Sequence, residues 1–345
     1  MSVSEDEDGK SECNDCYEGG VSQDPDFGVD IRDGLRTEAM NWILTVVPPY
    51  DLPSHTRKPS IYSKDLYQQL LQHPDTRFLA AYIFGRYFLA CKGGDSGCTI
   101  PDSSASPSAH NVKPVTDARR RADLEDGERR LVWDFALAAV ALSVKVQRDF
   151  LPPLCPIYIR DFLVLAPHEM SHDDLEAAQR DILHALSYRV STPTPEAYLD
   201  ELHSALPALR QLAVALGGCT GWDAMRKDVW ARLLAAVQEP DLYRFPISVL
   251  VAAALQRAIG SMLVRHEGRQ LGQFQEKASS RCASQIQINR QRIGPVSRLA
   301  WGVQQDIQNI LQVPQILLDE CKRWLSPLRF ENPSGQDWFD HASST

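Results

Sequence analysis

Two segments of this sequence are apolar on nearly every side of a helix, and they lie in opposite halves of the chain. Residues 131–146 read LVWDFALAAVALSVKV, and residues 247–259 read ISVLVAAALQRAI. A helix that is apolar all round is stable only when other elements cover it on every side. We therefore expect each half of the chain to form a bundle of helices around one buried central helix.

The rest of the sequence is also helical in pattern. Apolar residues recur at helical spacing, and the apolar–polar alternation that is typical of strands is absent. Further helices are predicted at residues 36–47, 62–71, 77–90, 157–165 and 175–186 in the first half, and at 196–204, 222–237, 271–287 and 307–324 in the second. Pro193 and Pro195 mark the boundary between the halves. The sequence thus predicts an all-α protein with two tandem domains of about five helices each, at residues 29–192 and 193–330.

Three segments have no such pattern. Residues 1–28 are acidic, glycine-rich and short of large apolar side chains, which is typical of a disordered tail. Residues 93–127 are predicted to form a long loop inserted into the first domain. Residues 331–345 are predicted to be a loose tail.

The composition indicates a globular protein and argues against several classes of partner. Hydrophobic residues make up 43% of the chain and charged residues 23%. The net charge of −9 makes nucleic acid an unexpected partner, and no apolar run of about 20 residues predicts a membrane span. Cys13 and Cys16 form the only close pair of the eight cysteines, and no second pair completes a zinc site.

One short motif has the form of a zinc hydrolase site, but its context argues against that reading. His168 and His172 frame the sequence HEMSH. A zinc hydrolase needs both histidines on one helix, whereas Pro167 precedes the first and Ser171 is expected to cap the helix that follows. We therefore expect no metal, no cofactor and no catalytic residue.

Four segments, in order along the chain, resemble the cyclin family. They are LRTEAMNWILTV at 35–46, LAAYIFGRYF at 79–88, LSVKVQRDFLPPL through STPTP at 142–195, and PDLYRFPISVLVAAAL at 240–255. The resemblance implies two tandem cyclin boxes of five helices each. It also implies a non-enzymatic regulatory subunit that binds and activates a cyclin-dependent serine/threonine protein kinase, controls the cell cycle, and resides in the nucleus and cytoplasm.

The resemblance also implies a set of kinase-binding residues. Lys145 falls on the family's contact lysine, while Gln179 takes the place of the family's glutamate. Glu176 lies one turn earlier on the same helix face and is a possible substitute. The apolar groove of the family corresponds to positions that suit a plain core equally well: Leu142, Val146, Leu183, Tyr188 and Val190.

A second patch of the family docks substrates of the kinase, and it corresponds here to Leu35, Trp42, Val132 and Trp133. Structural packing of Trp42 between two helices is the competing interpretation. Gly85 replaces a family aspartate, which leaves Arg36 without its expected partner. These departures keep a second hypothesis open, in which the chain is a degenerate cyclin-fold scaffold that binds a protein without activating a kinase.

Overall fold

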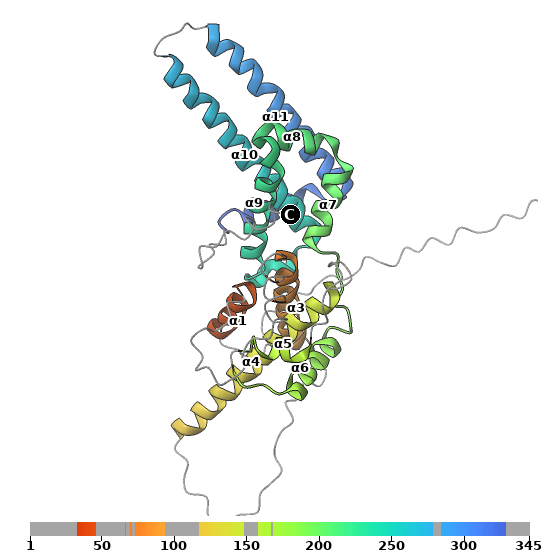
Figure 1. Cartoon of the computed structure of the whole chain (residues 1–345). Helices are drawn as coiled ribbons and strands as arrows, with labels where there is room; N and C mark the ends of the chain where they lie inside the picture. Colours follow the sequence, from red (N-terminus) through yellow and green to blue (C-terminus); the bar gives the residue numbers. More distant parts are fainter. Residues whose placement is uncertain are drawn as a thin grey trace, which may run out of the picture.

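The protein is all-α in the part of the chain that the structure describes. The computed structural model describes residues 33–45, 66, 70, 73–93, 117–147, 158–166, 168–278 and 284–328, and every regular element within these ranges is a helix (Figure 1). The predicted tails at 1–28 and 331–345 lie outside the described residues. So does the helix predicted at 62–71, except for the buried helical residues Leu66 and Leu70.

The first half is organised around one long central helix. Its elements are α1 (Asp33–Thr45), α3 (Pro74–Gly93), α4 (Asp117–Gln147), α5 (Ile159–Leu163) and α6 (His172–Ala185). Helix α4 packs against α1, α3 and α6, and its residues from Phe135 to Val144 are buried throughout. The buried helix that the apolar pattern of 131–146 predicts is therefore present.

The second half repeats this arrangement around α10. Its elements are α7 (Pro195–Ala205), α8 (Pro207–Gly217), η2 (Gly218–Thr220), α9 (Gly221–Ala236), η3 (Pro240–Arg244), α10 (Ile247–Ala278), α11 (Ser284–Ile310) and α12 (Gln315–Leu325). Helix α10 packs against α7, α8, α9, α11 and α12. By length and composition its stretch Ile247–Arg269 would span a membrane, but 61% of its most apolar window is buried, as in a core helix.

Several helix boundaries differ from the sequence-based predictions, and the helix predicted at 271–287 is divided between the end of α10 and the start of α11. Helix α4 begins at Asp117, so residues 117–127 are helical although they were predicted as loop. Helix α10 continues to Ala278, and with α11 it forms a long hairpin that extends from the body (Figure 1). The predicted helix at 307–324 is divided because α11 ends at Ile310 and Pro314 caps α12.

The two halves meet along α3. The backbone N–H of Glu196 in α7 donates to Asp75 at 3.3 Å. The ring of Phe78 lies edge-on to that of Trp230 in α9, with ring centroids 6.1 Å apart. The rings of Tyr82 and Tyr243, which lies in η3, have centroids 5.3 Å apart. One face of α3 therefore carries polar and aromatic contacts to the second half.

Gly85 lies in this interface, and its surroundings explain the missing side chain. A Cβ atom at Gly85 would lie 1.9 Å from the hydroxyl oxygen of Tyr243. That hydroxyl donates a hydrogen bond to the carbonyl oxygen of Tyr82 at 3.3 Å. Gly85 thus allows Tyr243 of the second half to approach the backbone of α3.

Candidate functional site

The two polar residues predicted to bind a kinase are in direct contact. Lys145 is exposed in the last turn of α4, and its Nζ donates to Oε1 of Gln179 in α6 at 2.5 Å. Gln179 is only 6% exposed, and its Nε2 donates to the carbonyl oxygen of Leu175 at 3.2 Å. Both ends of the amide are therefore used, which fixes the direction in which its oxygen faces Lys145.

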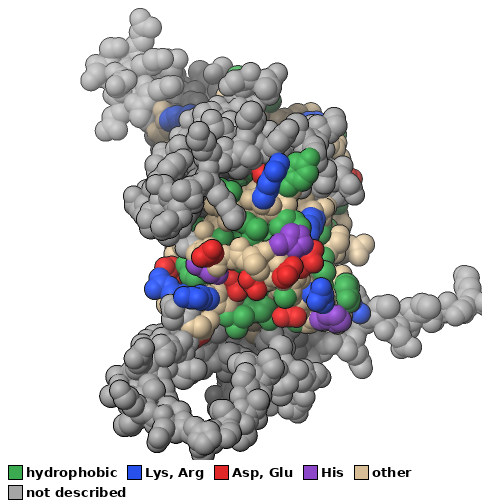
Figure 2. Space-filling model, turned by 60° about the horizontal axis from the view of Figure 1, so that its bottom comes forward, with side chains coloured by type: hydrophobic (Ala, Val, Ile, Leu, Met, Phe, Trp, Pro, Cys, Tyr) green, Lys and Arg blue, Asp and Glu red, His purple; other side chains and the backbone are tan. Residues whose placement is uncertain are grey.

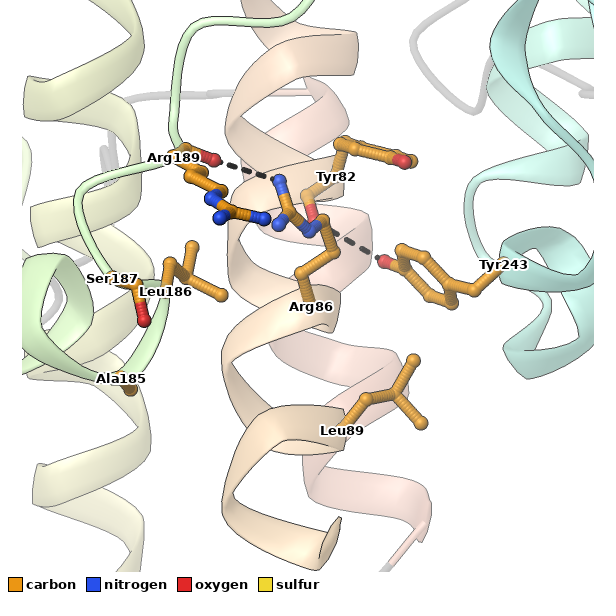
Figure 3. Close-up of a pocket in the computed structure, with 8 residues that line it drawn as sticks. All are labelled: Tyr82, Arg86, Leu89, Ala185, Leu186, Ser187, Arg189 and Tyr243. Carbon is orange, nitrogen blue, oxygen red and sulfur yellow. Dashed lines mark hydrogen bonds between the residues drawn. The ribbon is translucent and has the colours of Figure 1, made fainter. Parts of the chain in front are cut away.

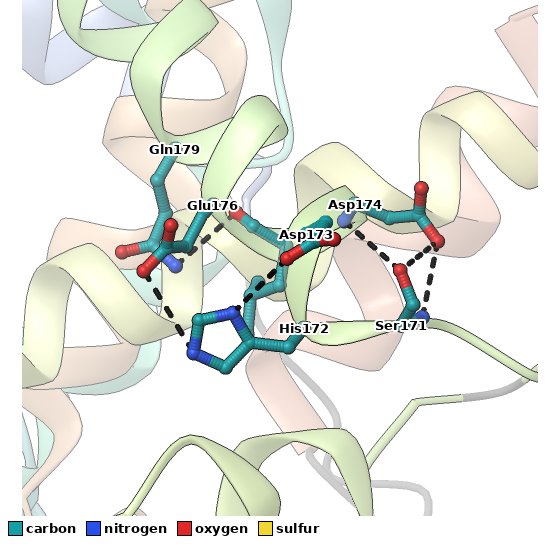
Figure 4. A network of polar contacts seen from close by, with 7 residues as sticks. Ser171, His172, Asp173, Asp174, Glu176 and Gln179 are labelled. Carbon is teal, nitrogen blue, oxygen red and sulfur yellow. Dashed lines mark hydrogen bonds and ion pairs between the residues drawn. The ribbon is translucent and has the colours of Figure 1, made fainter.

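Glu176, the predicted substitute for the missing glutamate, pairs with a different residue. Its carboxylate lies 3.8 Å from Nε2 of His172, one turn earlier on α6, and the same imidazole lies 3.6 Å from Asp173 (Figure 4). All three side chains are at least half exposed, so these ion pairs are weak.

Helix α6, which carries Glu176, Gln179 and Leu183 of the predicted site, begins where the sequence indicates. The Ser171 hydroxyl accepts from the backbone N–H of Asp174 at 3.2 Å, and the Asp174 carboxylate accepts from the backbone N–H of Ser171 at 3.0 Å (Figure 4). This reciprocal pair is a capping box. The hydrogen bonds from Ser171 also hold the pKa of Asp174 below its usual range.

The five predicted groove residues divide between core and surface. Leu142 is 6% exposed and belongs to the core. Val146, Leu183 and Val190 are half-buried and pack against the core from its edge. Tyr188 is 63% exposed, has a φ of 60°, and places its hydroxyl 3.4 Å from Nε2 of His184. Val146 follows Lys145 directly and Leu183 lies one turn after Gln179 on α6, so these two half-buried residues form an apolar border beside the polar pair.

The end of the molecule that carries α4, α5 and α6 presents a mixed surface. Figure 2 shows acidic and histidine side chains in the middle of this face, with Lys and Arg side chains around them and apolar side chains among them. Helix α6 carries the exposed acidic residues Asp173, Glu176 and Asp181. A surface with side chains of both charges suits a polar protein partner better than a purely apolar one.

The predicted substrate-docking patch is largely closed by packing. Trp42 of α1 and Trp133 of α4 form an edge-on pair with ring centroids 5.6 Å apart. Trp133 is 8% exposed and Val132 only 1%, while Leu35 and Trp42 are half-buried. Two of the four residues are therefore inaccessible to a peptide, as the competing structural interpretation of Trp42 predicts.

The two histidines of the HEMSH sequence have separate partners. Nε2 of His168 lies 2.7 Å from Asp134 in α4, whereas His172 contacts carboxylates of α6. Among the described residues, no group of three or more His, Cys, Asp or Glu side chains is arranged to hold a metal ion.

An open groove between the halves was not identified from the sequence. It has a volume of about 500 Å³ and lies between α3, the turn that follows α6, and η3 (Figure 3). Its lining is Tyr82, Arg86, Leu89, Ala185, Leu186, Ser187, Arg189 and Tyr243. Residues from three elements contribute, so no local sequence pattern indicates it. Burial raises the pKa of Tyr243 well above its usual value, so this phenol is neutral across the physiological range.

Comparison with known proteins adds no family assignment, because neither a family model nor a curated protein matches this sequence.

Proposed function

We propose that this chain is a divergent two-box cyclin that binds a cyclin-dependent serine/threonine protein kinase through the face formed by α4 and α6. The observation that carries the proposal is the contact between Lys145 and Gln179. Their roles were assigned from the family resemblance alone, from positions 34 residues apart. Their meeting at one exposed edge supports a shared role there.

The arrangement of helices supports the finer proposal of two cyclin boxes, at residues 29–192 and 193–330. Each half has one apolar helix in its centre, α4 or α10, and the other helices of that half cover it. A box insertion would then occupy the segment between the end of α3 at Gly93 and the start of α4 at Asp117. The cellular role that accompanies this proposal is control of the cell cycle, in the nucleus and cytoplasm.

Binding and activation are separable on this face. The exposed Lys145 ammonium can donate to carbonyl oxygens of a kinase, and Leu183, Val146 and Tyr188 offer apolar contact beside it. Gln179 cannot provide a charged anchor, and a charge-assisted hydrogen bond is roughly twice as strong as a neutral one. We therefore expect kinase binding to be retained more fully than kinase activation.

The test is a pull-down with a panel of purified cyclin-dependent kinases, followed by a kinase assay on each complex. The change Lys145→Ala combined with Leu183→Asp is expected to abolish binding, because it removes the donor and places a charge in the apolar border. Lys227→Ala combined with Leu317→Asp is the matched control, since Lys227 is exposed and Leu317, like Leu183, is half-buried against the core, and both lie in the second half. Kinase binding that survives the first double change would rule out this interface.

The alternative is a cyclin-fold scaffold that holds a partner without activating a kinase. Gln179, and the burial of Val132 and Trp133 that closes the substrate patch, favour it. A stable kinase complex that stays inactive in the assay would decide for the scaffold. Substrate capture through Leu35 and Trp42 is the remaining role of the first-helix patch, and Trp42→Ala should weaken it only if that role is real.

A further inference from the structure

The groove between the halves carries two positive charges that no described carboxylate neutralises. Nη1 of Arg86 donates to the carbonyl oxygen of Arg189 at 2.9 Å, and its guanidinium lies 5.7 Å from the centre of the Tyr82 ring. Both of these partners are uncharged. Among the described residues, no carboxylate lies within 4 Å of either the Arg86 or the Arg189 guanidinium, and no acidic residue lines the groove.

The two guanidinium groups also lie on the same side of the groove. Figure 3 shows the side chains of Arg86 and Arg189 turned toward each other, with Ser187 on the turn beside them. Like charges placed side by side repel one another, and a bound anion would relieve that repulsion. Arg86 and Arg36 also lie close enough to Tyr243 for their positive charges to offset a small part of the rise in its pKa that burial causes.

The rest of the lining is suited to a peptide rather than to a small anion alone. The groove is open to solvent and, at about 500 Å³, is larger than a single anion requires. Small-molecule sites usually enclose most of their ligand, which an open groove does not do. Leu89, 39% exposed and one turn after Arg86 on α3, provides an apolar surface in the groove.

We propose that this groove binds a phosphorylated peptide segment, with the phosphate held between Arg86 and Arg189 and an apolar residue of the peptide against Leu89. A phosphate monoester carries close to two negative charges and three acceptor oxygens, which two forked guanidinium groups can share. A single Asp or Glu offers half the charge and a poorer geometric match to two arginines. Ser187, exposed on the turn, adds a hydroxyl donor at the edge.

This proposal is independent of the kinase interface. The groove uses none of the eight residues assigned to kinase binding, although Tyr188 belongs to the turn between Ser187 and Arg189. The Tyr188 hydroxyl faces His184 of α6, outside the groove lining. Failure of the groove proposal would therefore leave kinase binding unchanged, and the reverse also holds.

The test uses the full chain and a fluorescent library of peptides with a central phosphoserine and random flanking residues. We expect a subset of these peptides to bind, with selection for an apolar flanking residue. The same peptides without phosphate, or with Glu in its place, should bind at least tenfold more weakly, and raising the salt concentration should weaken binding further.

Two variants locate the site. Arg189→Glu is expected to lower the affinity for the selected peptides at least tenfold, and its exposed side chain makes no contact on which the fold depends among the described residues. Arg86→Gln should act in the same direction. Arg298→Glu is the control for net charge, because Arg298 is exposed on α11, away from the groove, and it should leave the affinity unchanged.

Three results would overturn the proposal. The first is that no phosphopeptide binds the protein, and the second is that phosphorylated and unphosphorylated peptides bind equally well. The third is that the Arg189→Glu variant binds the selected peptides with the affinity of the wild type. Inorganic phosphate provides the last arm of the experiment. If phosphate alone raises the melting temperature of the protein while no peptide binds, the groove is a site for a free anion and the peptide assignment is wrong.

Discussion

At the scale of single residues, two departures from the cyclin pattern that this sequence resembles have different physical meanings. Gly85 looks unfavourable in the sequence because glycine destabilises the middle of a helix by about 1 kcal/mol relative to alanine. The structure provides a reason for it, since Tyr243 occupies the space that a side chain would fill. Gln179 is instead held by hydrogen bonds, because its oxygen accepts from Lys145 and its Nε2 donates to the carbonyl oxygen of Leu175.

Gly85→Ala should therefore destabilise the protein even though alanine is the better helix former. The added Cβ would lie 1.9 Å from the Tyr243 hydroxyl and 2.8 Å from its ring carbon Cζ, so the ring or the helix must shift. We expect the free energy of unfolding to fall by about 1–3 kcal/mol, the usual cost of overpacking. Denaturant titration followed by circular dichroism measures the change.

The control is Gly268→Ala in α10, where an added Cβ meets nothing within 4 Å. This change should stabilise the protein by about 0.5–1 kcal/mol. In the double change Gly85→Ala with Tyr243→Phe, loss of the hydroxyl should recover part of the cost, giving a non-additive cycle. If Gly85→Ala stabilises the protein like Gly268→Ala, the contact with Tyr243 is not present in solution.

Gln179→Glu tests the other departure. The new carboxylate would form a charge-assisted contact with Lys145, which is stronger than the neutral one, but would lose the donor to the carbonyl oxygen of Leu175. We expect a net stability change within about 1 kcal/mol and a gain in kinase activation over the wild-type complex. Lower activation at unchanged kinase affinity would show that Gln179 itself is adapted to the partner.

At the scale of elements, the hydrophobic pattern predicted which helices are central but not how long they are. Residues 131–146 and 247–259 are buried cores of helices that extend much further, to Asp117 on one side and Ala278 on the other. The extensions are charged or mixed, so burial does not mark them. Helix α8 was missed, although Pro207 at its start and Gly218, with a φ of 67°, at its end are standard boundary signals.

The candidate site was predictable only in part, for a related reason. The resemblance to cyclins assigned Lys145 and Gln179 to one site, and the two side chains are in contact in the structure. Both lie on helices that the sequence pattern predicts. The groove at Arg86 and Arg189 depends on how η3 of the second half meets α3. That meeting is a long-range packing event, and no periodicity within one segment encodes it.

The contact between α3 and α7 makes the stability of this junction depend on pH. Asp75 accepts hydrogen bonds from the backbone of Glu196 and, at 3.0 Å, from the side chain of Gln147. Burial raises the pKa of Asp75 above 3.8, and the hydrogen bonds offset this only in part. The folded protein then holds this proton more tightly than the unfolded chain, so the Asp75 contribution to stability falls as the pH rises through the interval above 3.8.

The measurable quantity is the free energy of unfolding of the wild type minus that of Asp75→Asn. It should increase as the pH is lowered from about 7 toward about 4. Asp174→Asn is the matched control, because hydrogen bonds from Ser171 lower the pKa of Asp174 and reverse the sign. Chemical denaturation at a series of pH values gives both differences, and a slope of the same sign for the two variants would contradict the assignment.

At the scale of the whole molecule, we expect the contacts shared by the two halves to couple their folding. Trp230 of α9 is fully buried, and its Nε1 donates to Glu196 at 2.9 Å while its ring contacts Phe78 of α3. Arg226 of α9 forms an ion pair with the same Glu196. The Glu196 carboxylate also lies close enough to Asp75 of the first half for the two negative charges to interact. Disturbing Phe78 therefore removes a contact that belongs to both halves at once.

Phe78→Ala should separate the unfolding of the two halves. Phe78 is 1% exposed, and truncating a buried phenylalanine costs about 3–5 kcal/mol. In the wild type we expect amide protons of α4 and α10, the central helices, to exchange with similar free energies of opening, as in one cooperative unit. Without the Phe78–Trp230 contact the two values should diverge.

Phe88→Ala is the matched control, because Phe88 packs within the first half against Phe84, Tyr87 and Phe135. It should lower stability without separating the two helices. Divergence in both variants, or in neither, would mean that the Phe78–Trp230 contact is not what couples the two halves.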